Sequence, residues 1–265
     1  MNIINYLYPN GGKCAVTFSY DDAHDSNRRL VETFNKYGIK STFHMNAGTF
    51  DQPGNLCSDE IEALFAGHEM AGHTTDHPFL SQQPAETVLS QLLDDRARLE
   101  QLVKYPVKGF SYPFGDYRAG VVAHTKSAGY VYARTCDNTY NVFWPDDFLR
   151  WNPSCHHYEL DKVLHKAKDI SRWSPIALLY IWGHAFEFER NDDWNILDEM
   201  CKKVSEIPNV WLATNIEVMD YVQALRSLRW SMDGSTVDNP SRLDVLVEID
   251  DVPVVISPGF RTCGQ

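Results

Sequence analysis

The sequence lacks an excess of basic residues and any long apolar run. Its 24 lysines and arginines are outnumbered by 36 aspartates and glutamates, which gives a formal net charge of −12. This balance argues against nucleic acid, whose phosphates favour a basic surface, and against docking on an anionic membrane. No stretch approaches the roughly 18 uninterrupted apolar residues that a membrane helix needs. We therefore expect neither nucleic acid nor a membrane as a partner, and the sequence indicates no particular oligomeric state.

Closely paired cysteines and a signal peptide are also missing. The cysteines form no C-x-x-C pair, so a disulfide framework is not indicated and reduced thiols are expected. Residues 1–10 contain no basic region followed by an apolar stretch. Both observations favour a cytoplasmic protein, although a secreted chain whose signal had been removed would read the same. The six cysteines are Cys14, Cys57, Cys136, Cys155, Cys201 and Cys263.

Short apolar, β-branched or aromatic runs alternate along the chain with amphipathic stretches at helical spacing. The predicted strands are Cys14–Phe18, Ser41–Met45, Glu69–Ala71, Val107–Ser111, Tyr130–Ala133, Ile176–Trp182 and Val210–Ala213. The predicted helices are Asp25–Tyr37, Asp59–Ala66, Pro84–Val103, Tyr117–Ala128, Leu160–Ser171, Asp193–Val204 and Ile216–Ser227.

This alternation predicts an α/β fold with a parallel sheet, because parallel neighbours need crossover connections. Seven strand-then-helix units suit an irregular (β/α)7-type barrel better than an open doubly wound sheet, which is the alternative. After Leu228 the pattern changes, and Leu243–Ile249 and Pro253–Ile256 alternate like a hairpin. We therefore expect a barrel domain over residues 1–228 and a C-terminal β-hairpin appendage packed on it over residues 229–265.

Chemically useful residues follow the predicted strands. In parallel α/β folds the site collects at the carboxyl ends of the strands, because the variable loops leave there. A placement of so many such residues on one rim indicates a functional site more strongly than any one of them does. The residues at these strand ends are Asp21, Asp22, Asn46, His73, His77, Pro113, Phe114, Gly115, Arg134, His184, Thr214 and Asn215.

Two of these strand ends carry residues that suit a metal ion. If residues 74–77 form a helical turn, His73 and His77 face the same way and both imidazoles reach one ion. Of the adjacent carboxylates Asp21 and Asp22, one can bind the ion while the other accepts a proton from water. Taken alone, the histidines could equally cap a turn, and the aspartates could be a solvated strand end.

Two further features of the second half of the chain have open interpretations. His184 ends an apolar run, where it either finishes a core strand or serves the site. Cys155-His156-His157 resembles a ligand cluster, but neighbouring residues usually point apart, so we expect a substrate-facing or structural role there instead of a second metal. Several tryptophans crowd this half, most of them expected in the core, although some could stack on a sugar face. They are Trp144, Trp151, Trp182 and Trp194.

Together these pieces resemble the polysaccharide deacetylase family (carbohydrate esterase family four). The match spans roughly residues 13–215, and its second motif, H-S/T-x-x-H-P/S, is complete. The family's T-F-D-D-G reads Thr17-Phe18-Ser19-Tyr20-Asp21-Asp22-Ala23, the second motif is His73-Thr74-Thr75-Asp76-His77-Pro78, R-x-P-Y/F-G reads Ser111-Tyr112-Pro113-Phe114-Gly115, and L-x-H reads Trp182-Gly183-His184.

The resemblance implies a (β/α)7-type barrel that removes acetyl groups from N- or O-acetylated sugars with one divalent ion. It implies Asp22, His73 and His77 as metal ligands, Asp21 as general base and His184 as general acid. Zinc suits two imidazoles and a carboxylate best, while cobalt, nickel or iron bind the same set. On the oxyanion and substrate side we expect Phe114, through its backbone N–H, together with Tyr112 and Arg134.

Two departures from the family pattern concern the groups that support the acid and the base. The Arg that orients the base in the family is Ser111 here, and Arg134 or Arg150 are the candidates to replace it. That hypothesis requires a guanidinium within hydrogen-bond reach of Asp21. The family's D-W motif, whose Asp tunes the acid histidine, has no clean match, and the candidate carboxylates are Asp146, Asp147 and Glu187.

Two alternatives to an acetylated-sugar deacetylase stay open. One is an amidase that acts on a small non-sugar amide, although relatives of that kind often lose metal ligands and this chain keeps all three. The other is a saccharide-binding protein without catalysis, which the missing Arg favours. The retained Asp21 and His184 argue against it, because binding alone needs no acid–base pair.

Overall fold

The computed structural model describes residues 3–170 and 176–263, so the ends of the predicted domain ranges and Ser171 of the predicted helix Leu160–Ser171 lie outside it. Its largest sheet has the strand order β6-β5-β4-β3-β2-β8-β7, with β9 paired to β2. Each pairing of this sheet is parallel, and all seven predicted strands are confirmed. The strands are β2 (Cys14–Asp21), β3 (Thr42–Met45), β4 (Glu69–Gly72), β5 (Gly109–Ser111), β6 (Tyr132–Arg134), β7 (Cys155–His156), β8 (Ala177–His184) and β9 (Trp211–Leu212).

The two edges of this sheet approach each other through residues 151–156, so the sheet curls into the predicted irregular barrel. Trp151 forms a parallel bridge with Arg134 of the edge strand β6. Three residues later Ser154 donates its backbone N–H to the carbonyl of Tyr180, 2.8 Å away on β8. A short irregular segment thus closes the barrel in place of a long strand.

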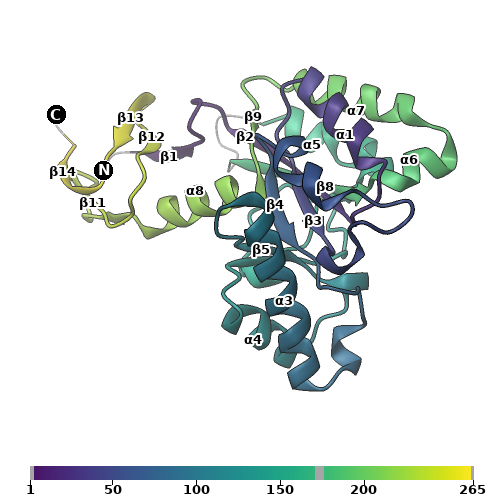
Figure 1. Ribbon diagram of the computed structural model, residues 1–265. Helices are drawn as coiled ribbons and strands as arrows, with labels where there is room; N and C mark the ends of the chain where they lie inside the picture. Colours follow the sequence, from purple (N-terminus) through teal and green to yellow (C-terminus); the bar gives the residue numbers. More distant parts are fainter. Residues whose placement is uncertain (1–2, 171–175, 264–265) are drawn as a thin grey trace.

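Helices cover the outside of the barrel (Figure 1). The predicted helices are present, but residues 157–168 form a 3₁₀ turn and the short α5 in place of one long helix, and α6 is not predicted by the sequence pattern. The helices are α1 (Asn27–Lys36), α2 (Ile61–Leu64), α3 (Ala85–Val103), α4 (Ala119–Ser127), α5 (Leu164–Lys168), α6 (Ala185–Asn191), α7 (Trp194–Ser205) and α8 (Asn215–Ser227).

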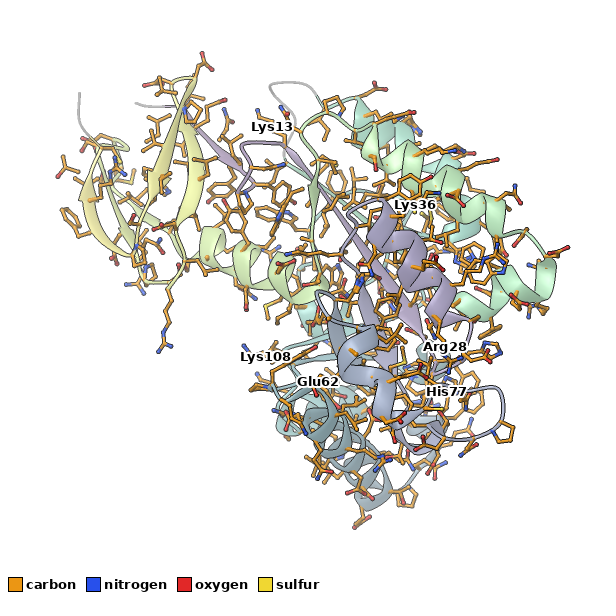
Figure 2. All side chains as sticks on the ribbon, turned by 45° about the horizontal axis from the view of Figure 1, so that its top comes forward. Lys13, Arg28, Lys36, Glu62, His77 and Lys108 are labelled. Atoms are coloured by element: carbon orange, nitrogen blue, oxygen red, sulfur yellow. The ribbon has the colours of Figure 1, made fainter. Side chains whose placement is uncertain are left out.

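The strands alternate between an apolar outer face and a polar inner face, because successive side chains of a strand point to opposite sides. On β2, Phe18 faces outward and packs against Phe34 of α1, with ring centroids 5.0 Å apart. Its neighbour Ser19 faces inward and hydrogen-bonds His44 of β3. Side chains fill the space between the helices and the sheet, and His77 lies far from Lys13, which precedes β2 (Figure 2). The site is therefore at one end of a barrel with a polar interior.

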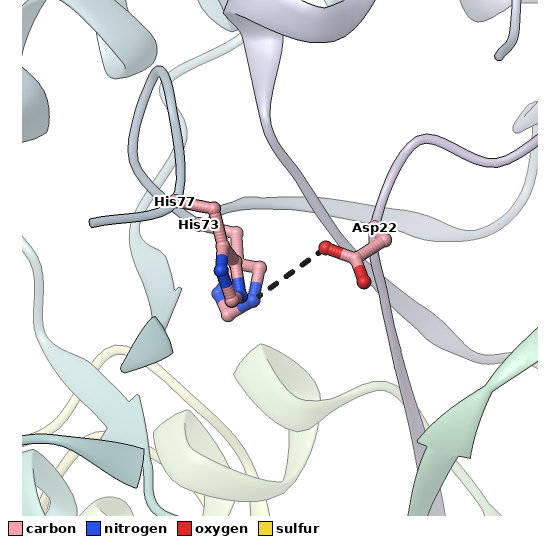
Figure 3. A group of neighbouring side chains, drawn as sticks. All are labelled: Asp22, His73 and His77. Carbon is pink, nitrogen blue, oxygen red and sulfur yellow. Dashed lines mark ion pairs between the residues drawn. The ribbon is translucent and has the colours of Figure 1, made fainter. Parts of the chain in front are cut away.

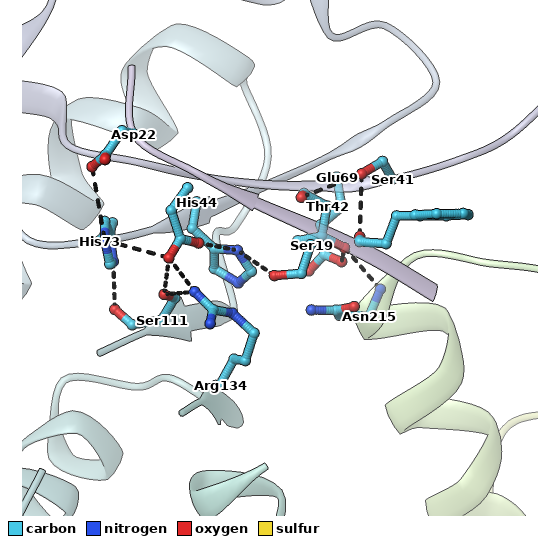
Figure 4. Close-up of polar contacts among 12 residues, drawn as sticks. Ser19, Asp22, Ser41, Thr42, His44, Glu69, His73, Ser111, Arg134 and Asn215 are labelled. Carbon is cyan, nitrogen blue, oxygen red and sulfur yellow. Dashed lines mark hydrogen bonds and ion pairs between the residues drawn. The ribbon is translucent and has the colours of Figure 1, made fainter. Parts of the chain in front are cut away.

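The expectation that Thr214 and Asn215 lie on the functional rim is wrong. Strand β9 pairs only with Ala15 and Val16, near the start of β2, so its carboxyl end stops inside the barrel. There Asn215 hydrogen-bonds Thr17 at 2.7 Å and begins α8. The N-terminal turn of α8 also donates to Glu69, whose pKa burial raises to about 7. These residues therefore form hydrogen bonds inside the barrel, where Figure 4 shows Glu69 and Asn215.

The C-terminal residues form two small antiparallel sheets beside α8 (Figure 1). The expected hairpin is present, with Asp250 and Asp251 at its tip in the left-handed region. Tyr221 of α8 ties the first sheet to the barrel, because its hydroxyl donates to the Leu7 carbonyl at 2.8 Å and accepts from the Leu246 N–H. The sheets have the orders β1-β12-β13 and β10-β11-β14, from β1 (Ile4–Leu7), β10 (Arg229–Trp230), β11 (Thr236–Asn239), β12 (Val245–Ile249), β13 (Val252–Ile256) and β14 (Gly259–Thr262).

Two expectations about the whole chain concern cysteines and membrane helices. The six cysteines all lie among residues 3–170 and 176–263, and each is a free thiol, as the sequence predicts. In the part of the chain that the structure describes, no helix combines the length and the apolar character required to cross a membrane.

Candidate metal centre and active site

Asp22, His73 and His77 converge at the carboxyl end of the barrel (Figure 3). Asp22 directly follows β2, and both histidines lie in the loop after β4. One ligand atom from each of the three lies within 4.8 Å of the others. They share a cavity of about 420 Å³ that is also lined by the following residues: Asp21, Tyr112, Phe114, Gly115, Arg134, Cys136, Trp182, His184 and Phe186.

The orientation of the His73 ring suits metal binding. Its Nδ1–H donates to the carbonyl oxygen of Ser111 at 2.7 Å, which leaves the lone pair on Nε2. That Nε2 lies 3.9 Å from Oδ1 of Asp22. A hydrogen bond from the second ring nitrogen to a carbonyl is the usual way in which a protein fixes the tautomer of a ligating histidine.

The helical turn that the H-x-x-x-H spacing suggested is wrong, although both histidines still reach one point. Residues 73–77 form an irregular loop in which Thr74 and His77 adopt left-handed backbone conformations, with φ of 69° and 58°. The Thr74 hydroxyl accepts the His77 N–H at 3.1 Å, and the Asn46 side chain donates to the His73 carbonyl at 2.7 Å. Side-chain hydrogen bonds, and not helical periodicity, bring the two rings together.

Asp95 of α3 is a supporting residue that the sequence pattern does not reveal. It is fully buried, and its two carboxylate oxygens accept the backbone N–H of Ala47 at 2.7 Å and of His73 at 3.0 Å. It therefore joins the loop after β3 to the loop that holds the metal ligands. Only the burial of a charged residue on the inner side of a long amphipathic helix would have pointed to it.

Asp95→Asn is expected to weaken zinc binding by about 10- to 100-fold, the usual cost of losing a supporting hydrogen bond behind a metal ligand. The amide NH₂ of Asn must face one of the two backbone donors, so we also expect a loss of about 1–3 kcal/mol in stability. Calorimetric titration with zinc measures the affinity, and urea unfolding measures the stability. Asp94→Asn, the same change at the neighbouring exposed position, is the matched control, and equal zinc affinities in the two variants would contradict the assignment.

Several residues at the site are held in a backbone conformation that non-glycine residues rarely adopt. Such strain costs on the order of 1–3 kcal/mol per residue and persists where the surroundings enforce it, often at functional sites. Asp22 is fixed by donating its N–H to the His44 carbonyl and by accepting the Asn27 side-chain amide at its own carbonyl. The site residues with this conformation are Asp22, Thr74, His77 and Phe114.

Asp21 lies in a buried cluster of polar groups, with its Oδ2 3.6 Å from Nε2 of His73. Figure 4 shows His44, Ser111 and Arg134 of this cluster. The Arg134 guanidinium binds Oδ2 of Asp21, and the Ser111 hydroxyl donates to the same oxygen at 3.0 Å. Burial alone would raise the pKa of Asp21, but the charge of the Arg134 guanidinium is the largest of the effects that hold it well below its usual range. Asp21 is therefore an ionised carboxylate, and its Oδ1 has no hydrogen-bond partner.

Arg134 meets the geometric condition for replacing the family's missing arginine, because its guanidinium reaches Asp21. It is 1% exposed and also donates to Ser111 Oγ at 2.6 Å. Arg150 instead pairs with Asp147 at 2.8 Å on the surface. A guanidinium from the neighbouring strand β6 thus occupies the place of the missing one, and the small side chain of Ser111 leaves room for it.

Glu187 is the carboxylate that contacts His184. Its Oε2 accepts the His184 backbone N–H at 3.1 Å and lies 3.3 Å from the ring Nδ1. Burial opposes a charge on His184, but the hydrogen bond to Glu187 and the charge of Asp21 raise its pKa above the ordinary value. The ring is therefore suited to carry and donate a proton near neutral pH.

Two further histidines contact Asp21 and Glu187: His44, which was not predicted, and His156, for which a substrate-facing or structural role was expected. His44 lies with Nδ1 3.5 Å from Oδ1 of Asp21, and burial lowers its pKa well below the ordinary value, so it is neutral there. His156 donates to Oε2 of Glu187 at 2.9 Å. A sequence signal for His44 existed in the alternation of polar and apolar residues within its strand.

The cavity wall is aromatic. Phe114 is 53% exposed and stacks on Phe79 with ring centroids 3.9 Å apart. Tyr112 also lines the cavity, and its hydroxyl donates to the Leu149 carbonyl at 2.9 Å. Of the tryptophans, Trp182 lines the cavity while Trp151 and Trp194 are buried in the core.

Comparison with known proteins finds a similarity to one family. Residues 9–133 match the family model described as polysaccharide deacetylase. A peptidoglycan-N-acetylglucosamine deacetylase of Bacillus cereus is 26% identical over 184 residues, which cover 68% of this chain and 78% of the relative. A candidate deacetylase of the same kind from Arthroderma benhamiae is 34% identical over 86 residues, 32% of this chain, and the chain spans only 20% of its length.

Solved structures with low identity share the fold. A candidate polysaccharide deacetylase from Mycobacterium smegmatis is 18% identical with a TM-score of 0.61, over 84% of this chain and 94% of that one. A family-four pseudoenzyme from Bacillus anthracis is 17% identical with a TM-score of 0.55, over 77% of this chain and 65% of that one. The chain is thus similar to the polysaccharide deacetylase family over residues 9–133, and the residues that resemble the family's motifs gather at one end of the barrel.

Proposed function

We propose that this protein is a metal-dependent hydrolase that removes acetyl groups from N- or O-acetylated sugars or saccharides. The observation that carries the proposal is the shared cavity, in which the three convergent ligand residues lie beside an ionised carboxylate and a histidine with a raised pKa. A protein that only binds saccharides has no need of such an acid–base pair. The fold alone does not decide this, since one structural neighbour is named a pseudoenzyme.

The residues Asp22, His73 and His77 fit a divalent ion. Two imidazoles and a carboxylate with His73 Nε2 free of a proton form a three-ligand set that leaves coordination positions open. Zinc suits this set best, and cobalt, nickel or iron are alternatives. When bound, such an ion acts as a Lewis acid that withdraws electrons from an acyl carbonyl.

Asp21 and His184 supply the two proton transfers of the proposed reaction. The free Oδ1 of Asp21 accepts a proton from the attacking water, while Arg134 and Ser111 hold the other carboxylate oxygen in place. His184, kept protonated by Glu187, donates a proton to the leaving nitrogen or oxygen of the sugar. The backbone N–H of Phe114 is the candidate second donor to the developing oxyanion.

Two observations support the proposed substrate class. The Bacillus cereus relative is named for N-acetylglucosamine in peptidoglycan. The exposed rings of Phe79 and Phe114 beside the ligand residues form a rim on which a sugar face can stack. We therefore place acetylated amino sugars first among the substrates to be tested.

The test is acetate release from a panel of N- and O-acetylated mono- and oligosaccharides, with and without chelator. We expect acetate release that chelator abolishes and added zinc restores. Activity that survives complete removal of metal would contradict the metal-dependent mechanism. Metal binding without acetate release from any member of the panel would favour an amidase for small amides or an inactive saccharide-binding protein.

A further inference from the structure

A second group of ligand-type side chains lies behind His184. His156 ends β7, His157 begins the 3₁₀ turn that follows it, and Glu187 lies in the first turn of α6. Although the two histidines are neighbours in sequence, their ring centroids lie 4.2 Å apart and both approach the same carboxylate. Oε2 of Glu187 is 2.9 Å from Nε2 of His156 and 3.6 Å from Nε2 of His157. The expectation that neighbouring residues point apart is therefore wrong here.

His157 has no hydrogen-bond partner at either ring nitrogen, although its side chain is fully buried. The ring is held between Phe188, with centroids 4.3 Å apart, and Tyr20, with centroids 5.8 Å apart. A buried polar atom without a partner costs about 1–3 kcal/mol, and such an atom in a native structure calls for an explanation such as a bound ion or water. The position of its Nε2, facing Glu187, favours a shared ligand between the two residues.

We propose that His156, His157 and Glu187 bind a second divalent cation. One ligand atom from each residue lies within 4.8 Å of the others, and two imidazoles with one carboxylate are a set that suits zinc. This site shares no residue with the set Asp22, His73 and His77, and the proposal does not depend on the deacetylase activity. His156 and Glu187 are 18% and 15% exposed, so an ion can enter from solvent while His157 closes the inner side.

The second site is coupled in space to the active site through Glu187. The Oε2 atom that would bind the ion is the same atom that lies 3.3 Å from Nδ1 of His184. An ion at this position therefore shares the carboxylate with the proposed general acid. An ion bound here can therefore affect the proton transfer by His184 without contacting the substrate.

The experiment is a count of bound zinc. Protein stripped with chelator is titrated with Zn²⁺ alone, and binding is followed by calorimetry and by elemental analysis after gel filtration. We expect two zinc ions per chain in the wild type and one in Asp22→Asn, which removes a ligand of the first site only. We expect one zinc ion also in Glu187→Gln, which keeps a hydrogen-bond acceptor for His184, and in His157→Phe, which keeps a ring between Tyr20 and Phe188.

Controls separate a specific site from surface binding and from misfolding. Tyr158→Phe changes a ring that packs beside both histidines but removes no ligand, so this variant should retain both ions. His156→Ala, at a half-exposed position, tests the site again where a buried variant fails to fold, and should bind one ion. A wild type that saturates at one ion, which Asp22→Asn then loses, would overturn the proposal. A second ion that persists in Glu187→Gln, His157→Phe and His156→Ala would assign it to surface carboxylates and overturn it equally.

Discussion

In Asp21→Asn we expect kcat for acetate release to fall by about 10³-fold, within the range that a positioned general base contributes. The substitution keeps the shape of the side chain and an oxygen that can accept from Arg134 and Ser111, but removes the free lone pair at Oδ1 that would take the proton from water. The zinc content should remain that of the wild type, because Asp22, His73 and His77 are unchanged. Steady-state kinetics and elemental analysis on the same preparation measure both quantities.

The neighbouring variant Asp22→Asn is the matched comparison, because it makes the same chemical change one residue later. We expect it to lose the ion of the first site and activity together, and zinc added in excess should restore little of either. His73→Ala should behave in the same way. Equal turnover in Asp21→Asn and the wild type would remove Asp21 as the base, and loss of zinc from Asp21→Asn would make it a ligand instead.

Seven strands of the largest sheet and their parallel arrangement could be predicted from the sequence, because each is a short apolar run separated from the next by an amphipathic stretch. Strand β7 could not, since it is two residues long and pairs only at Cys155 and His156. The short segment through Trp151 that closes the barrel could not be predicted for the same reason. Strand β1 escaped prediction because its partner β12 lies more than 200 residues away, and no local pattern reports such a pairing.

The convergence of Asp22, His73 and His77 could be predicted because Asp22 and His73 directly follow strands and the two histidines fall in a recognisable motif. The groups that position them could not, since their role depends on contacts between distant segments. Asp95 reaches two loops from the middle of α3, and Glu187 approaches His184 and His156 from a helix that no pattern indicated. The helical turn considered for residues 74–77 is absent, and hydrogen bonds from the Asn46 side chain and to the Thr74 hydroxyl hold the loop instead.

The alternation of polar and apolar residues within the strands indicates more about the site than the residues at the strand ends do. From Thr17 onward every second residue of β2 is polar and faces the barrel interior, as Thr17, Ser19 and Asp21 show through their contacts across it. The same alternation places His44 of β3 and Arg134 of β6 inside. A polar inner face of this kind indicates a barrel whose interior supports the site, and it identifies His44 and Arg134 together with Asp21.

The Arg134→Met variant is expected to lose about 3–5 kcal/mol of stability at pH 7, which is the usual cost of leaving a buried charge without its partner. Asp21 is 3% exposed, and Arg134 is the largest of the charges that oppose the effect of burial on it. In the wild type the depressed pKa of Asp21 stabilises the fold at every pH above about 3.9, its unfolded value, and this contribution is lost only as pH falls toward the folded pKa. In the variant, burial is no longer opposed by Arg134, so the pKa of Asp21 rises and protonation relieves the buried charge.

The difference in stability between the wild type and Arg134→Met should therefore shrink as pH is lowered from 8 to 5. Urea unfolding of chelator-treated protein at both pH values measures it, with the metal removed so that binding does not add to stability. The double variant Asp21→Asn with Arg134→Met removes both charges together, and we expect it to be more stable at pH 8 than Arg134→Met alone and to lack this pH dependence. The Arg134→Met variant could instead lose the same stability at pH 5 and at pH 8, with no recovery in the double variant. That result would mean that Arg134 stabilises the barrel by packing against Trp182, whose ring centroid lies 4.5 Å from the guanidinium, and not by balancing the charge of Asp21.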